Sequence, residues 1–153
     1  MKQPNDRHIF VFEPCFFLFF GLFHLHRLWG IVDRTAYANF WLAVMNEKDV
    51  FYYGLMGLLA LFCILGVVTF FRYRKHNFWW RWIYLFGGVY VLFDLFAIAT
   101  GLTFWQRLLY WMFDVNAPYW NVLWGGFVLL GMFSFILGVY LLQQRCKENR
   151  TLS

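Results

Sequence analysis

Four long apolar blocks alternate with shorter polar or mixed segments along this chain. They cover about residues 9–31, 50–71, 78–102 and 119–142. Each block reaches the roughly 20 residues that a helix needs to cross the hydrocarbon core of a bilayer. Helices are expected because backbone polar groups in lipid must be satisfied within their own segment, and the blocks are too uniformly apolar for barrel strands. The pattern predicts an all-α integral membrane protein, with residues 1–153 forming one domain of four transmembrane helices.

Two segments between the blocks carry a mixed pattern. Residues 33–49 read DRTAYANFWLAVMNEKD, and residues 103–118 read TFWQRLLYWMFDVNAP. Each combines Trp, Tyr and Leu with a few charges, as an amphipathic helix lying in a membrane interface does. We therefore predict two interfacial helices, both on the extracytoplasmic side. Plain loops rich in aromatic residues are the alternative.

The two halves of the chain share a short pattern. With a shift of 72 residues, GLMGL and ILGV from Gly54 onward lie over GFVLL and ILGV from Gly126 onward. Each half would then consist of a helix, an interfacial helix and a second helix. The pattern predicts a two-fold internal repeat, with a pseudo-twofold axis near the membrane normal.

The composition supports a membrane protein. Hydrophobic residues make up 62% of the chain and charged residues 14%, whereas a soluble domain carries roughly 25% charged residues. The net charge of +5 does not indicate nucleic-acid binding, because the basic residues lie beside the apolar blocks, as membrane anchors do. The three cysteines lie in different segments without CxxC spacing and predict neither a disulfide framework nor a redox pair.

The distribution of basic residues predicts the orientation. Nine lie before the first block, at or near the connection between the second and third, or after the fourth: Lys2, Arg7, Arg72, Arg74, Lys75, Arg81, Arg145, Lys147 and Arg150. The other two connections hold Arg34, Lys48 and Arg107. By the positive-inside rule both termini are cytoplasmic, in a multi-pass protein of a plasma membrane such as the bacterial inner membrane. The first block is expected to be a retained helix and not a signal peptide, because Glu13 and Pro14 interrupt its apolar run.

The first block contains polar side chains that a lipid-facing helix does not need. Their spacing of three or four residues places five side chains on one helical face: Glu13, Phe17, Phe20, His24 and Arg27. His26 is expected to point elsewhere. Glu13 is expected near the cytoplasmic face, in contact with Arg7, Arg81 or water.

Asp94 is the single acidic residue of the third block. At 1.5 Å per residue, His24 and Asp94 both lie roughly 10–12 Å inside the outer boundary. An unpaired aspartate at that depth costs about 2.5–3.5 kcal/mol, and a partner at the same level offsets the cost. We therefore predict a contact of Asp94 with Arg27 or with His24.

This polar cluster allows two interpretations. One is an ion pair that locks two helices together while Arg27 extends toward the outer interface. The other is a pocket in the outer leaflet for a lipid, a quinone-like or another amphiphilic molecule, because intramembrane ionisable groups are often functional. There Arg27 would hold an anionic or carbonyl head group, His24 would transfer a proton, and Asp94 would orient it.

Other chemistries find no support in the sequence. Haem b needs histidines on facing helices, and the second, third and fourth blocks contain none. A zinc site needs three or four clustered ligands, and no HExxH, GxSxG or P-loop motif occurs. No metal site and no cofactor are predicted.

Tryptophans gather near the ends of the blocks. Six are expected at the outer interface, namely Trp29, Trp41, Trp105, Trp111, Trp120 and Trp124, and three at the inner one, namely Trp79, Trp80 and Trp82. Most of them are interpreted as belt residues, because the amphipathic indole ring favours the head-group region.

The sequence therefore favours a non-catalytic function, as an accessory or scaffold subunit of a membrane complex or as a homo-oligomer. Small residues on three of the blocks offer surfaces for close helix packing. The expected partners are membrane lipids and another membrane protein or a second copy of this chain, with no nucleic acid. The alternative is a membrane-embedded binding or enzymatic site, roofed near Trp41 and Trp111, with a polar cluster of His24, Arg27, Asp94 and Glu13.

Overall fold

The computed structural model describes residues 9–73 and 78–152. Within these ranges the chain is helical without strands. Four segments are long and apolar enough to cross a membrane: Phe12–Val32, Val50–Arg72, Trp79–Thr100 and Trp120–Arg150. The prediction of an all-α chain with four apolar segments long enough to span a membrane is thus confirmed for the described residues. Of the basic residues used to predict the orientation, Lys2, Arg7, Arg74 and Lys75 lie outside the described residues.

The first span consists of two helices, α1 (Phe12–Leu25) and α2 (Leu28–Val32). Between them, the backbone N–H of Arg27 donates to the carbonyl of His24 at 3.2 Å, and that of Trp29 donates to the carbonyl of His26 at 3.1 Å. These bonds join residues three apart instead of four, so the chain tightens into a 3₁₀-like turn. The first span is therefore interrupted at the positions where its polar residues lie.

Two aspartates begin the next helices, α3 (Arg34–Glu47) and α4 (Val50–Arg72). Asp33 accepts a hydrogen bond from the backbone N–H of Ala36, and Asp49 accepts one from that of Tyr52, both at 2.9 Å. Such caps satisfy amide groups that have no partner within the helix. Between the helices, Lys48 adopts a left-handed conformation with φ 48°, which ends α3 and turns the chain into α4.

The second half contains α5 (Trp79–Thr100), α6 (Thr103–Met112) and α7 (Trp120–Leu152). Gly101, with φ 69°, provides the turn from α5 to α6, where a side chain would be strained. The predicted segment 103–118 is helical only over its first 10 residues. The predicted end of the last span near residue 142 is not the end of its helix. α7 continues because the polar residues that follow the apolar block are also good helix formers.

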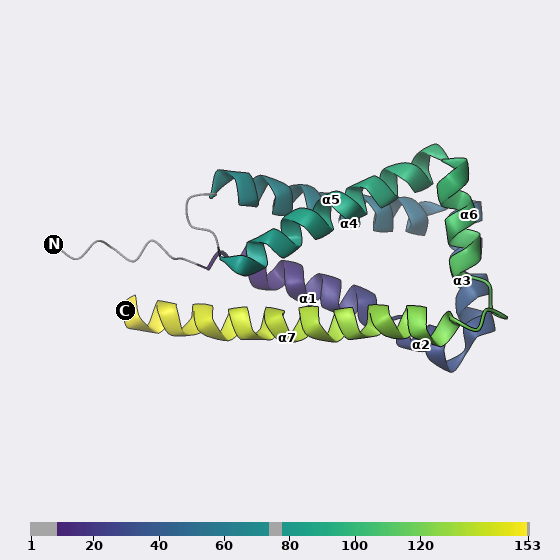
Figure 1. Cartoon of the computed structure of the whole chain (residues 1–153). Helices are drawn as coiled ribbons and strands as arrows, with labels where there is room; N and C mark the ends of the chain where they lie inside the picture. Colours follow the sequence, from purple (N-terminus) through teal and green to yellow (C-terminus); the bar gives the residue numbers. More distant parts are fainter. Residues whose placement is uncertain (1–8, 74–77, 153) are drawn as a thin grey trace.

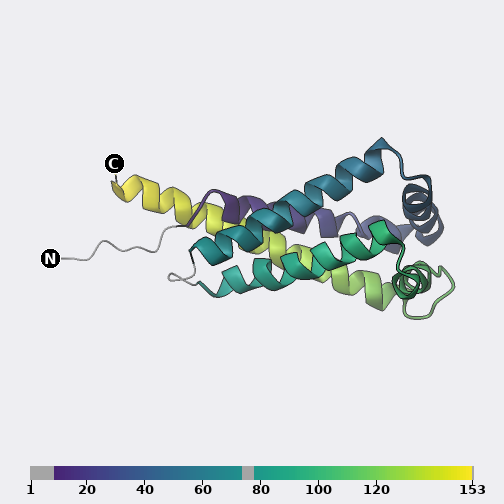
Figure 2. The ribbon, with the colours of Figure 1, turned by 90° about the horizontal axis from the view of Figure 1, so that it is seen from above.

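The long helices pack as two pairs, α1 with α7 and α4 with α5. Figures 1 and 2 show that α1 begins and α7 ends at the same end of the molecule, while α3 and α6 run across the opposite end. Both segments expected to be interfacial therefore contain helices, and the alternative of plain loops is wrong. Each half has the order long helix, short helix, long helix, with α2 completing the first long segment.

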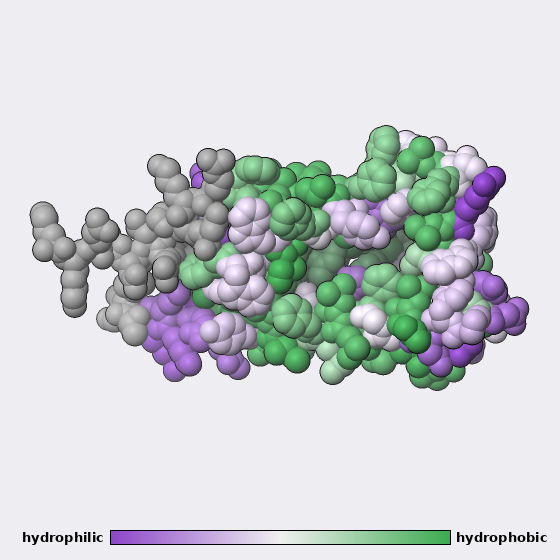
Figure 3. Space-filling view, viewed as in Figure 1, coloured by the Kyte–Doolittle hydropathy of each residue, from purple (hydrophilic) through white to green (hydrophobic). Residues whose placement is uncertain are grey.

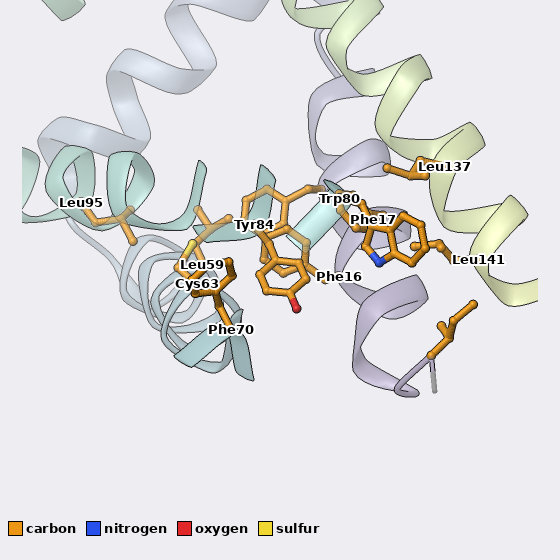
Figure 4. Close-up of a cluster of buried hydrophobic side chains, with 12 residues drawn as sticks. Phe16, Phe17, Leu59, Cys63, Phe70, Trp80, Tyr84, Leu95, Leu137 and Leu141 are labelled. Carbon is orange, nitrogen blue, oxygen red and sulfur yellow. The ribbon is translucent and has the colours of Figure 1, made fainter. Parts of the chain in front are cut away.

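The main core lies where the two pairs meet (Figure 4). It is formed by side chains from all four long segments, including Phe16, Phe17, Cys63, Tyr84 and Leu141. A second cluster joins α3 to the start of α7 and contains Tyr37, Ala38, Phe113, Trp120 and Trp124. In Figure 3, hydrophobic residues cover the middle of the visible face, and hydrophilic residues gather toward its two ends.

Candidate functional site

A cavity of about 180 Å³ lies between the two helix pairs, at the end that α3 and α6 cover. The visible face is hollowed between the pairs (Figure 3). All four long segments and both transverse helices contribute to its walls, which are mainly apolar and aromatic. His24, Arg27 and Asp94 all line this cavity. The structure thus brings together three of the four predicted site residues.

His24 and Arg27 form one polar unit on the side of α1 and α7. Nη1 of Arg27 donates a hydrogen bond to Nδ1 of His24. Because a guanidinium group can only donate, Nδ1 is the accepting nitrogen, and the proton of a neutral His24 lies on Nε2. Phe127 of α7 supports both groups: its ring centroid is 4.4 Å from the Arg27 guanidinium and 5.9 Å from the parallel His24 ring.

His26 also lines the cavity, so the expectation that it points elsewhere is wrong. Its Nδ1 donates to the carbonyl of Phe23, and the hydroxyl of Tyr37 lies 3.2 Å from its Nε2. Since a carbonyl only accepts, Nδ1 carries the proton, and Nε2 of the neutral ring accepts from Tyr37. The tightened turn after α1 explains the misplacement, because residues in it no longer advance by 100° each.

Tyr37 connects this turn to α3. Its side chain is buried with 1% exposure, and burial raises the pKa of its hydroxyl to about 12. The neutral hydroxyl is therefore the form that donates to His26 at physiological pH.

Asp94 reaches the cavity from the other helix pair. Nε1 of Trp105 in α6 donates to Oδ1 of Asp94 at 2.5 Å. Within the described part of the chain, Asp94 forms neither of the direct contacts predicted for it, with Arg27 or with His24; Arg27 attracts it only across the cavity. The predicted depth was compatible with contact, but the cavity separates the two helix pairs at this level, and Trp105 takes the place of the expected partner.

Glu13 lies apart from the cavity, near the start of α1. Nε of Arg81 donates to its Oε1 at 2.5 Å, and the hydroxyl of Tyr84 donates to the same oxygen at 3.3 Å. The predicted contact with Arg81 is confirmed, whereas Arg7 lies outside the described residues. Glu13 therefore belongs to a buried ion pair between α1 and α5 and does not share the pocket of the other three residues.

Four side chains that line the cavity carry a buried polar atom without a hydrogen-bond partner in the described structure. These atoms are Nε of Arg27, Nε1 of Trp41, the hydroxyl of Tyr52 and Nε1 of Trp124. Leaving such a group unsatisfied costs about 1–3 kcal/mol, so unsatisfied polar groups are rare in native proteins. All four can donate a hydrogen bond. Side chains of this kind in a cavity wall supply donors for a bound molecule that presents accepting oxygens.

Most of these donors were not recognisable from the sequence as parts of a site. Trp41 was expected to form part of the roof and does line the cavity, whereas Trp111 does not, and Trp105 lies there instead. Trp120 and Trp124 were expected in the outer belt, but they are only 0% and 2% exposed. They pack between the start of α7 and α3, and Nε1 of Trp120 donates to the carbonyl of Gly30 in α2 at 2.8 Å.

The polar side chains of the site form hydrogen bonds with one another and with the backbone. Within residues 9–73 and 78–152, no group of three or more His, Cys, Asp and Glu side chains is arranged to hold a metal ion. Comparison with protein-family models, curated proteins and solved structures finds no match to this chain. The cavity and its polar groups are therefore the basis for proposing a function.

Proposed function

We propose that this protein binds a small amphiphilic molecule in the cavity between its helix pairs. The observation that carries the proposal is an apolar cavity with four unpartnered buried donors on its lining residues. Ligand sites commonly combine apolar walls with a few polar groups that orient the ligand. Oxygen atoms of a head group would satisfy the donors, and the apolar walls would contact the rest of the molecule.

The proposed setting is a plasma membrane, such as the bacterial inner membrane, with both termini in the cytoplasm. The start of α1 and the end of α7 share one end of the molecule, as an even number of spans requires. Arg72, Lys147 and Arg150 lie at the ends of helices on that side, where the positive-inside rule expects basic residues. The cavity would then lie in the outer leaflet.

In this setting α3 and α6 lie in the outer interface and form the roof of the cavity. Both run across the ends of the long helices (Figure 1). Both combine aromatic and aliphatic residues with polar ones, for example Trp105 and Leu109 beside Gln106 and Arg107 in α6. Such a composition fits a helix lying at the boundary between head groups and acyl chains.

The packing of the long helices supports an internal two-fold repeat. If the halves correspond, α1 matches α5, α3 matches α6, and α4 matches α7. A two-fold rotation then maps the pair formed by α1 and α7 onto the pair formed by α5 and α4. These are the two pairs that pack most extensively. The cavity would lie on the pseudo-twofold axis, between the repeats, where membrane proteins of this kind often bind their ligands.

Two valines on α5 provide a direct test of binding. Val91 lines the cavity, whereas Val89 is 52% exposed on the outside of the same helix. Wild-type protein purified in a mild detergent should carry a small amphiphile that native mass spectrometry and extraction detect. Val91→Trp should fill the cavity and remove most of this adduct, and Val89→Trp should retain it. A folded wild-type protein without an adduct, or a Val91→Trp variant that keeps it, would contradict the proposal.

A scaffold or accessory function is the second candidate, in a complex or a homo-oligomer. A Cβ atom at Gly54, Gly57 or Gly87 would meet nothing within 4 Å, so another helix could approach α4 or α5 closely there. The mass of the protein in mild detergent tests this function. A strictly monomeric particle without a partner would count against it.

A further inference from the structure

We infer that the cavity selects an uncharged head group bearing carbonyl or hydroxyl oxygens, in preference to a carboxylate or phosphate. This inference rests on the proposed binding function and specifies the class of ligand. It follows from the charge balance of the walls, from their hydrogen-bonding groups and from the size of the cavity.

The charged groups on the described walls balance each other. Arg27 supplies one positive charge and Asp94 one negative charge, from opposite helix pairs. His24 cannot carry a positive charge while its Nδ1 accepts from Arg27. A positive charge on His26 would lie near that of Arg27, which disfavours it. An anionic ligand would bring an excess negative charge into a space of low dielectric constant, and such a charge is costly without its own counter-charge. An uncharged ligand avoids that cost.

The hydrogen-bonding groups also favour a head with both accepting and donating oxygens. The unpartnered donors of Arg27, Trp41, Tyr52 and Trp124 require acceptors. Asp94 uses Oδ1 to accept from Trp105, and no hydrogen bond engages its Oδ2 in the described structure. A carbonyl oxygen would satisfy the donors, and a hydroxyl could donate to Oδ2. A carboxylate would face Asp94 with an oxygen that can only accept.

The size of the cavity limits the head group. Its volume is about 180 Å³, and an apolar cavity of about 150 Å³ is known to accommodate benzene. A single six-membered ring or a glycerol-sized group therefore fits, while a longer tail would have to leave through the hollow between the helix pairs. The head of a quinone or quinol and that of a monoacylglycerol share this uncharged, oxygen-bearing chemistry.

Three probes with similar alkyl chains distinguish these ligands: decylubiquinone, monodecanoylglycerol and decanoate. Each is titrated by calorimetry into the full-length protein in a non-ionic detergent, at about pH 8, where decanoate is ionised. At least one uncharged probe should bind about tenfold more tightly than decanoate, a difference of about 1.4 kcal/mol. The tighter of the two uncharged probes identifies a quinone-type or a glyceride-type ligand.

Asp94→Asn tests the charge balance itself. It leaves an oxygen for Trp105 and removes the charge that opposes Arg27, so binding of decanoate should strengthen about tenfold relative to the uncharged probes. Asp114→Asn is the matched control, because Asp114 is exposed and does not line the cavity; its preference should equal that of the wild type.

The outcomes separate this inference from the binding function. If the wild type binds decanoate as tightly as the uncharged probes, the inference is overturned while the binding function stands. If no probe binds to folded wild-type protein, both are overturned. Should Asp94→Asn fail to fold, the ratio of the wild-type affinities decides the question alone.

Discussion

Glu13 and Arg81 are buried together, with exposed fractions of 0% and 1%. The carboxylate accepts from Arg81 and Tyr84 through Oε1, and from the backbone N–H of Phe10 through Oε2 at 3.1 Å. The pair therefore connects α1, α5 and the segment that precedes α1. Because both groups are removed from water, their attraction offsets part of the cost of desolvation.

Removing one member of this pair should destabilise the protein strongly. We expect Glu13→Ala to lower the free energy of unfolding by about 3–5 kcal/mol, because it breaks a buried ion pair and removes the carboxylate that Nε of Arg81 contacts. The double variant Glu13→Met with Arg81→Met should recover most of this loss. Unfolding in mixed micelles with a denaturing detergent measures both. Glu47→Ala at the exposed end of α3 is the control, and equal stability of Glu13→Ala and Glu47→Ala would contradict the prediction.

Tyr37 should make stability depend on alkaline pH. Burial raises the pKa of its hydroxyl from 10.0 to about 12, so between these values the unfolded chain loses the proton that the folded protein retains. The stability associated with this group is complete below pH 10 and falls as the pH rises through 12, by about 3 kcal/mol in all.

A comparison of the wild type with Tyr37→Phe isolates this contribution from those of the other tyrosines. The free energy of unfolding in mixed micelles is measured across the alkaline range for both proteins. Their difference should change between pH 10 and 12. Parallel pH profiles would show that Tyr37 titrates normally in the folded protein.

Among the elements, α1 and α7 approach each other most closely at glycines. A Cβ atom on Gly21 would lie 2.7 Å from the backbone N of Phe135, and one on Gly138 would lie 2.8 Å from the backbone N of Leu18. Neither backbone can move aside without shifting its helix. The close approach of this pair therefore depends on the absence of a side chain at both positions.

Replacing a glycine by alanine should affect stability differently at a closely packed position and at an open one. Gly21→Ala should destabilise the protein by about 1–3 kcal/mol, because overpacking forces α1 and α7 apart. Gly57→Ala should be neutral or stabilising, since a Cβ atom there meets nothing within 4 Å and alanine favours helix. Unfolding in mixed micelles measures both variants. A Gly21→Ala variant as stable as Gly57→Ala would show that the two helices are less closely packed.

In the molecule as a whole, the two ends differ in chemistry. The ends of α4 and α7 on one side carry Arg72, Lys147 and Arg150. The opposite end is covered by α3 and α6 and contains the cavity. The basic residues at one end are the basis for the proposed orientation in the membrane.

Cysteine labelling should show these two ends on opposite sides of the membrane. The natural Cys146 is exposed near the end of α7, and Asn46 is exposed near the end of α3. In a variant with Cys15 and Cys63 replaced by Ser, an impermeant thiol reagent should reach Cys146 only from the cytoplasm. With Cys146 also replaced, Asn46→Cys should react only from outside. Labelling of Cys146 from outside would reverse the proposed orientation.

The sequence determined the features that depend on position along a single segment. Apolar block length predicted four spans, because a helix rises by a fixed 1.5 Å per residue and the backbone must satisfy itself in lipid. The same rise placed His24 and Asp94 at similar depth, and both line one cavity. It also placed Glu13 within reach of Arg81, a contact that the structure contains.

Only the tertiary structure decided what lies between segments. Lateral distance and rotation depend on how side chains of different helices pack, which spacing along the chain does not encode. A cavity therefore separates Asp94 from Arg27, where the sequence predicted a contact. Asp94 instead accepts a hydrogen bond from Trp105 of α6, which runs across the ends of the long helices. The tightened turn likewise brought His26 to the site, and packing under α3 buried Trp124 beside it. These positions result from contacts between residues far apart in sequence.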